Sequence, residues 1–185
     1  MLILEEPKVI RLLASSVKPA ILSLLGNRPM TETQLSKELG LTKAAVGYHL
    51  HPLRDAGLIK IDRYETGEHG ISKYYSAAAV LFIVDPDQIP EDVRRRFLET
   101  QIDHAEGMLS VFRFYDRISK VSPEDLEELA KAMLRQLKAI GERYVEEKVV
   151  DEDAETFRVE IYAEALINLT KERDWAILKE PPKGT

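Results

Sequence analysis

Between residues 30 and 77 the spacing of apolar residues changes from a helical to a strand pattern. Residues 58–64 alternate between apolar and polar side chains, as in a half-buried strand, and residues 71–77 can return after a polar turn. Upstream, two runs of apolar residues recur at the spacings of buried helix faces: Leu35 and Leu39, then Val46, Leu50 and Leu53. The pattern therefore predicts two short helices followed by a β-hairpin.

Residues at the ends of the two predicted helices support these boundaries. Thr31 and Gln34 have the spacing of a capping box, in which each side chain bonds the backbone N–H of the other residue. Gly40 can adopt the left-handed conformation that ends a helix, and Thr42 is a good N-cap for the next one. Only Leu41 separates these two signals, so the helix axes must cross sharply, as in a helix-turn-helix.

The outward face of the second helix is the candidate for chemistry. It mixes small, aromatic and hydrogen-bonding groups, and an α-helix fits the major groove of DNA, where base edges are distinguishable. An ordinary solvent-exposed helix face is the simpler alternative, but the caps, the short turn and the hairpin together favour DNA contact. We expect the contacting residues to be Thr42, Lys43, Ala44, Gly47, Tyr48, His51 and Arg54.

Other residues near this face are ambiguous. Arg63, His69 and Lys73 on the hairpin could touch phosphate or the minor groove, and solvation alone explains them equally well. His49 lies nearer the buried side, which favours a partly buried, hydrogen-bonded structural histidine. Pro52 lacks the N–H that would bond the Tyr48 carbonyl, so we expect the helix to kink in its last turns.

This segment resembles ArsR-like winged helix-turn-helix transcription regulators, especially those of archaea. The resemblance rests on TETQLSKELGLTKAAVGYHLHPLRDAGLI, on the hairpin ending KYYSA, and on ASSVKPAILSLL upstream. It implies a homodimer that binds double-stranded DNA at a palindromic operator, usually as a repressor, with binding altered by an effector.

The chain departs from the metal-sensing branch of that family. It contains no cysteine, which excludes disulfides and thiolate metal sites. Asp103, His104 and Glu106 lie on a later predicted helix, but no second ligand pair accompanies them at helical spacing. We therefore expect neither a metal nor a cofactor.

Composition fits a cytoplasmic protein that is not membrane-bound. The 185 residues are 44% hydrophobic, and no run approaches the roughly 20 apolar residues of a membrane span. A net charge of −6 is unusual for a DNA-binding protein, but it is unevenly distributed. Residues 1–76 hold ten basic and eight acidic side chains, whereas residues 77–185 hold sixteen and twenty-four. Because phosphate contacts depend on local charge, an acidic C-terminal half can coexist with modest DNA affinity.

Turn residues around Asp85 to Pro90 predict a domain boundary. We expect a winged helix-turn-helix domain over residues 1–84 and a helical dimerisation and effector domain over residues 85–185. The overall fold class is then mainly α, with a small β-hairpin as the wing.

The C-terminal half contains three predicted helical segments. The first runs from Pro90 to about Ile118, the second from Ser122 to Glu147, and the third from Phe157 to Leu178, where alternation over 157–161 also allows a strand. The tail from Lys179 to Thr185 should be frayed. The first helix carries two adjacent apolar stripes, so one can meet a second subunit; the candidate dimerisation residues are Phe97, Leu98, Ile102, Ala105, Met108, Leu109 and Phe112.

Alternatives remain for this half and for the whole chain. The apolar helices suit a pocket for a small apolar effector, although core and dimer packing explains them more simply. The basic run of residues 94–96 is best explained by pairing with Glu91, Asp92 and Glu99. A winged helix that binds another protein is the main functional alternative. An enzyme is disfavoured, because phosphate loops, metalloprotease motifs and nucleophile elbows are absent from the sequence.

Overall fold

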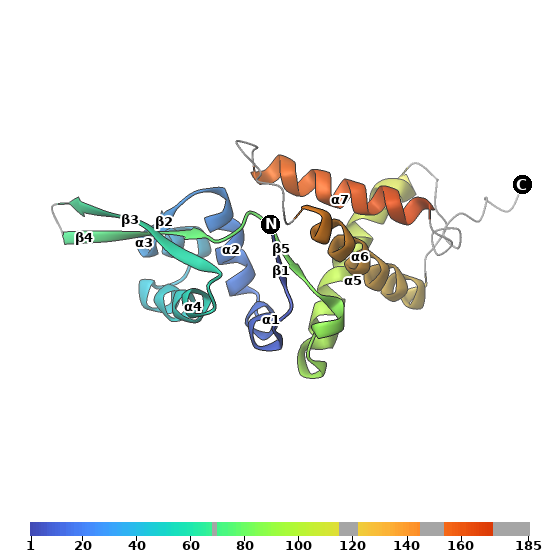
Figure 1. Ribbon diagram of the computed structural model, residues 1–185, viewed down its shortest axis with the longest axis horizontal. Coiled ribbons are helices and arrows are strands. Elements are labelled where there is room, and N and C mark those ends of the chain that lie inside the picture. Colours follow the sequence, from blue (N-terminus) through green and yellow to red (C-terminus); the bar gives the residue numbers. More distant parts are fainter. Residues whose placement is uncertain (68–69, 115–121, 145–153, 172–185) are drawn as a thin grey trace, which may run out of the picture.

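The computed structural model describes residues 1–67, 70–114, 122–144 and 154–171. Figure 1 shows the hairpin and α4 at one end of the molecule, the three C-terminal helices at the other, and β1 beside β5 between them. The mainly α fold with a hairpin wing is thereby confirmed. In chain order the elements are β1 (Leu2–Leu4), α1 (Pro7–Leu13), α2 (Val17–Asn27), β2 (Met30–Thr31), α3 (Glu32–Leu39), α4 (Lys43–Asp55), β3 (Ile59–Gly67), β4 (Gly70–Ala77), β5 (Phe82–Val84), a 3₁₀ turn (Pro86–Gln88), α5 (Glu91–Phe114), α6 (Pro123–Tyr144) and α7 (Ala154–Lys171).

The predicted caps of α3 and α4 are confirmed. The Thr31 backbone N–H donates to Gln34 Oε1 at 2.8 Å, and the Gln34 N–H donates to Thr31 Oγ1 at 3.2 Å. Gly40 ends α3 in the left-handed region with φ 64°. Thr42 Oγ1 then accepts from the Ala45 N–H at 3.2 Å and starts α4. These local bonds define both helix ends and therefore the short turn between them.

Helix α4 is oriented by its apolar face, as predicted. Val46, Leu50 and Leu53 are buried in the N-terminal core, which they share with Leu35 of α3 and with residues of α1 and α2. Pro52 lies inside α4, and the helix continues to Asp55. The predicted kink at Pro52 stays a prediction.

The hairpin belongs to a three-stranded antiparallel sheet in the order β2-β4-β3. β3 and β4 are longer than predicted, because β3 extends to Gly67 and β4 begins at Gly70. The two-residue strand β2 was not predicted; its Met30 pairs with Tyr75 of β4. This pairing attaches the root of the hairpin to the residue that precedes the α3 N-cap.

A second, unpredicted sheet lies beside the predicted domain boundary. Strand β1 pairs in parallel with β5, so that Leu4 lies opposite Val84. Helix α6 packs directly on this pair, because a side chain at Gly141 would come within 2.9 Å of the Ile83 side chain. Lys138 of α6 also pairs at 2.8 Å with Asp85, whose side chain is only 5% exposed. The packing of α6 on β1 and β5 thus crosses the proposed boundary at residue 85, and the ion pair holds α6 to the residue at that boundary.

The described C-terminal helices agree with the predicted segments. α5 is described to Phe114 and α6 spans Pro123–Tyr144, with the Ser122 hydroxyl accepting from the Asp125 N–H at 3.1 Å. The ambiguous residues 157–161 are helical, within α7. The predicted tail from Lys179 to Thr185 lies outside the described residues.

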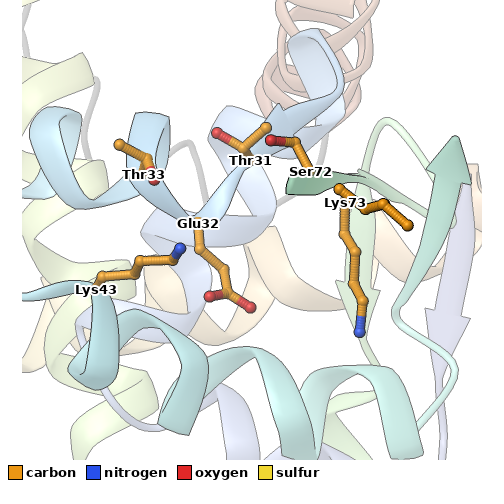
Figure 2. Close-up of a pocket in the computed structure, with 7 residues that line it drawn as sticks. Thr31, Glu32, Thr33, Lys43, Ser72 and Lys73 are labelled. Carbon is orange, nitrogen blue, oxygen red and sulfur yellow. The ribbon is translucent and has the colours of Figure 1, made fainter. Parts of the chain in front are cut away.

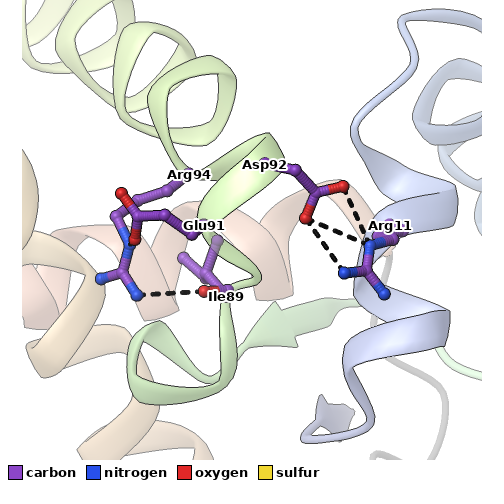
Figure 3. Close-up of polar contacts among 5 residues, drawn as sticks. All are labelled: Arg11, Ile89, Glu91, Asp92 and Arg94. Atoms are coloured by element: carbon purple, nitrogen blue, oxygen red, sulfur yellow. Dashed lines mark hydrogen bonds and ion pairs between the residues drawn. The ribbon is translucent and has the colours of Figure 1, made fainter.

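Two of the three predicted partners for the basic run on α5 are confirmed. Arg94 pairs with Glu91 at 2.8 Å and Arg95 pairs with Glu99 at 2.9 Å. The prediction was wrong for Asp92, which pairs with Arg11 of α1 (Figure 3).

Within the described part of the chain, no single helix has the length and apolar character needed to cross a membrane. Only α1 and α2 taken together pass that test by length and composition, and they meet at an angle of 90°.

Candidate nucleic-acid interface

The outward face of α4 is free of packing, because its opposite face is fixed in the core. Tyr48 is 75% exposed, and its ring meets the edge of the His49 ring at a centroid distance of 5.4 Å. His51 is also exposed, and its Nδ1 lies 2.8 Å from a carboxylate oxygen of Asp55. Arg54 is exposed beside them. Ala44 is exposed as well, whereas Gly47 is half-buried, so the accessible surface along α4 consists mainly of Ala44, Tyr48, His51 and Arg54.

The N-terminal end of α4 adds a positive charge to this surface. Thr42 uses its hydroxyl to cap the helix, which leaves its side chain exposed but already bonded. Lys43 is exposed and forms no ion pair within the described residues. Since the helix N-terminus carries a partial positive charge, Lys43 and the first turn of α4 together suit a phosphate group.

A groove separates α4 from the hairpin, and sequence reasoning missed the acidic residue in it. Glu32, the first residue of α3, lines this groove together with Lys43 of α4 and Lys73 of β4. Figure 2 shows the Glu32 side chain between the two lysines. Its Oε1 accepts from the Tyr75 hydroxyl at 3.2 Å. Glu32 is thus fixed by the hairpin, and its charge limits how positive the groove becomes.

The pKa of the Tyr75 hydroxyl agrees with its role as the donor in this hydrogen bond. Burial raises the pKa of the Tyr75 hydroxyl, and the negative charge of Glu32 raises it further. The phenol therefore stays protonated and donates to Glu32. This bond ties the start of α3 to β4, the central strand of the sheet.

Of the predicted hairpin residues, Arg63 and Lys73 differ sharply. Arg63 binds Asp62 at 2.9 Å and Glu65 at 2.8 Å, and its guanidinium stacks 4.0 Å above the centre of the Tyr74 ring. These bonds hold the pKa of Arg63 above its ordinary value. Its charge is balanced within the hairpin, whereas Lys73 pairs with no carboxylate in the described part of the chain. His69 lies outside the described residues.

The hairpin also exposes apolar surface that the sequence analysis did not single out. Tyr64 is 60% exposed and Ile71 is 70% exposed. Both lie in the outer part of the hairpin, where residues 62–67 and 70–73 are exposed on both faces of the strands.

The predicted partial burial of His49 is confirmed, but its predicted hydrogen bonding is not. It is partly buried, but its Nδ1 is buried and has no hydrogen-bond partner within the described chain, so the predicted hydrogen bonding is wrong for this atom. Burial lowers the pKa of His49, and the charge of Lys18 lowers it further.

The structure describes the side chains of only some of the candidate dimerisation residues. Phe97 packs against the N-terminal core and Ile102 against the C-terminal core, while Leu98 is half-buried. The side chains of Ala105, Met108, Leu109 and Phe112 lie outside the described residues. Helix α7, however, exposes Val159 and Ile167 at 60% and 54%. Exposed Ala163 lies between them at helical spacing, so α7 presents an apolar stripe that sequence reasoning missed.

Metal binding finds no support among the described side chains. No group of three or more histidine, aspartate or glutamate residues there is arranged to hold an ion. Of the acidic and histidine residues considered on α5, the His104 side chain is outside the described residues.

The geometry defines a winged helix-turn-helix, and the family comparison agrees. Residues 15–60 match the model of the bacterial regulatory protein, arsR family. The matched segment runs from the α1–α2 turn into β3, so it includes the whole of α3 and α4. This part of the chain is therefore similar to the helix-turn-helix of ArsR-family regulators.

Solved structures show weaker likeness. A mutant of ZitR from Lactococcus lactis in apo form is 24% identical, over 71% of this chain and 83% of that one, with a TM-score of 0.33. The adhesin competence repressor AdcR from Streptococcus pyogenes is 17% identical, over 71% and 82%, with a TM-score of 0.32. Both TM-scores are too low to define the arrangement of the whole chain. No curated protein sequence matches the chain.

Proposed function

We propose that this protein is a sequence-specific DNA-binding transcription regulator that acts as a homodimer and represses from a palindromic operator. One observation carries the proposal: α4 is capped, buried on one face, and exposes Tyr48, His51 and Arg54 on the other. A helix held in this way can enter the major groove and present hydrogen-bonding groups to base edges. The arsR family match over the same segment supports this role.

The weak positive charge around α4 explains why tight operator binding needs two copies of the chain. The free cations near α4, Lys43 and Lys73, are opposed by Glu32, so a single module holds phosphate weakly. Joining two modules makes the second binding event intramolecular, which raises the affinity without new contacts. A two-fold dimer also requires an operator with matching symmetry.

A protein-binding winged helix is the second candidate, and one observation favours it. Ile71 and Tyr64 expose apolar surface on the hairpin, as a protein partner would require. The α4 face itself exposes no large aliphatic side chain, and this argues for DNA.

The test is a selection of bound fragments from genomic DNA of the source organism with the purified full chain. A shared palindromic motif is the expected result. The matched variants Tyr48→Ala, on the α4 face, and Ile71→Ser, on the hairpin, separate the two candidates. Loss of motif enrichment only with Tyr48→Ala supports base reading by α4, whereas fragments without any shared motif overturn sequence-specific binding.

A further inference from the structure

A cavity of about 610 Å³ lies at the joint between the winged helix and the C-terminal helices. It is bounded by the α1–α2 turn, by β5 and by α5, and its size falls within the roughly 300–1,000 Å³ of small-molecule sites. It is separate from the α4 surface. Its lining is divided into an apolar part and a polar part, and this division indicates the chemistry of a ligand.

The apolar part consists of Leu13, Phe82, Val84 and Phe97. Leu13 and Phe82 also line a neighbouring apolar cavity of about 440 Å³. These side chains already pack against the N-terminal core, so the wall is preformed. A ligand here needs an aromatic or aliphatic body.

The polar part carries an unbalanced positive charge. Arg96 is exposed at the mouth, and its Nη1 donates to the Ala14 carbonyl at 3.1 Å. Unlike its neighbours Arg94 and Arg95, it pairs with no carboxylate within the described chain. Ser16, the N-cap of α2, lines the same mouth, and the first turn of α2 contains no acidic residue. A carboxylate would meet both the guanidinium and the positive end of α2.

Gln101 supplies an independent indication. Its half-buried side chain lines the cavity, but its Oε1 is not accessible from the cavity in this conformation and has no hydrogen-bond donor within the described residues. An unpaired buried acceptor is costly, so this atom requires a donor. Arg96 and Gln101 lie five residues apart on α5, which is a rise of about 7.5 Å along the helix. The site therefore has an anion-binding end at Arg96 and a donor-requiring end at Gln101.

We propose that this cavity binds a small organic carboxylate with an apolar body and a hydroxyl or N–H donor at its far end. The carboxylate pairs with Arg96 beside the start of α2, the body packs on Phe82 and Phe97, and the donor bonds Gln101 Oε1 once the Gln101 side chain turns that atom toward the cavity. Because the walls come from both parts of the chain, the ligand favours the arrangement that best closes them. If the proposed regulatory function is correct, on which this last step rests, the ligand is the effector.

Isothermal titration calorimetry of the full chain tests the site with matched probes. The reference probe is 3-(4-hydroxyphenyl)propionate, for which we expect a dissociation constant between about 10 µM and 1 mM. One comparison probe, 3-phenylpropionate, lacks the donor, and the other, 3-(4-hydroxyphenyl)propan-1-ol, lacks the charge. Both should bind at least about fivefold more weakly.

Protein variants identify the two ends of the site. Arg96→Gln should weaken the two carboxylates and leave the alcohol unchanged, and Gln101→Leu should abolish the preference for the hydroxylated carboxylate. Arg95→Gln is the matched control, because Arg95 is 93% exposed, pairs with Glu99 and does not line the cavity. Circular dichroism of each variant checks that the fold is retained.

The outcomes separate the site from the proposed function. The proposal of a carboxylate site is overturned if the reference probe shows no heat of binding at about 5 mM, or if Arg96→Gln binds all probes as the native protein does. Binding that depends on Arg96, with no change in DNA affinity, retains the site and overturns its role as an effector site. Failure to bind any DNA overturns the proposed function and leaves the calorimetric result standing.

Discussion

The guanidinium of Arg11 in α1 binds both carboxylate oxygens of Asp92 at the start of α5, at 3.0 to 3.2 Å (Figure 3). The hydrogen bonds from Arg11 lower the pKa of Asp92. Both side chains are about half exposed, at 48% and 60%. Lys138 of α6 and Asp85, the residue that follows β5, form a second ion pair near this joint, with the Asp85 side chain only 5% exposed.

Mutation of these two ion pairs should lower thermal stability by different amounts. Asp92→Asn should change the thermal midpoint very little, because water and salt screen an exposed pair. Lys138→Met should lower the midpoint clearly, because it leaves the buried Asp85 carboxylate without its partner. Thermal denaturation followed by circular dichroism, at low and high salt, measures both. An equal effect of the two substitutions would show that burial does not govern the strength of this joint.

The exposed face of α4 predicts a split between base-reading and phosphate-binding residues. Tyr48→Ala or His51→Ala should cost roughly 1–3 kcal/mol at the operator and leave nonspecific binding almost unchanged, if the side chain reads a base edge. Lys43→Ala should weaken binding to all sequences alike and reduce the salt dependence by about one unit of slope.

Fluorescence anisotropy with operator and random duplexes at several salt concentrations separates these effects. Arg63→Ala is a useful comparison. Because Arg63 is already bonded to Asp62 and Glu65, it should contribute less to DNA affinity than Lys43 does. Equal losses on specific and random DNA for the Tyr48, His51 and Lys43 variants would show that α4 does not read sequence.

The apolar surfaces of α5 and α7 predict a homodimer and allow its interface to be located. Light scattering at micromolar concentration should give about twice the 21.1 kDa mass of one chain. Leu98→Glu should dissociate the dimer if α5 forms the interface, and Ile167→Glu should do so if the exposed stripe of α7 does. A mass of 21.1 kDa that is unchanged on dilution contradicts the dimer.

Control by the C-terminal half predicts the behaviour of a fragment and the spacing of the operator. Half-sites should lie about one helical turn apart, roughly 34–36 Å, because the dimer fixes the distance between the two α4 helices. A fragment of residues 1–85 should keep the caps of α3 and α4, remain monomeric, and lose operator affinity by orders of magnitude. Sedimentation and DNA titration measure this, and undiminished affinity for the palindrome would assign dimerisation to the N-terminal part.

His49 predicts a pH dependence of stability. Its pKa is lowered in the folded protein by burial and then by Lys18, so the unfolded chain takes up its proton first as the pH falls. The stabilising contribution is therefore present above the ordinary value of about 6.5 and is lost as the pH drops below it.

Urea denaturation at pH 7.5 and pH 5.5 measures this contribution. His49→Gln should reduce the difference between the two midpoints. His51→Gln removes an exposed histidine from the same helix and controls for the loss of one titrating group. A midpoint difference that His49→Gln leaves unchanged would assign the pH dependence to other residues.

Local signals predicted most of the winged helix, and longer-range contacts account for what was missed. The capping residues Thr31 and Thr42 and the apolar face of α4 act within a few positions of the chain, so they are visible in the sequence. Strands of two or three residues, such as β1 and β2, have no periodicity to detect, and their partners lie dozens of positions away. Glu32 was missed for a similar reason, because only folding brings it to Tyr75.

The parallel pairing of β1 with β5 also has a consequence for the order of events during synthesis. Leu4 cannot meet Val84 until the ribosome has added a further 80 residues after Leu4, which takes about 4–16 s at typical elongation rates. During that interval α2, α3 and α4 can already fold from contacts close in the chain, whereas β1 has no strand with which to pair. The nascent chain should therefore form α4 before its first strand, β1, is paired.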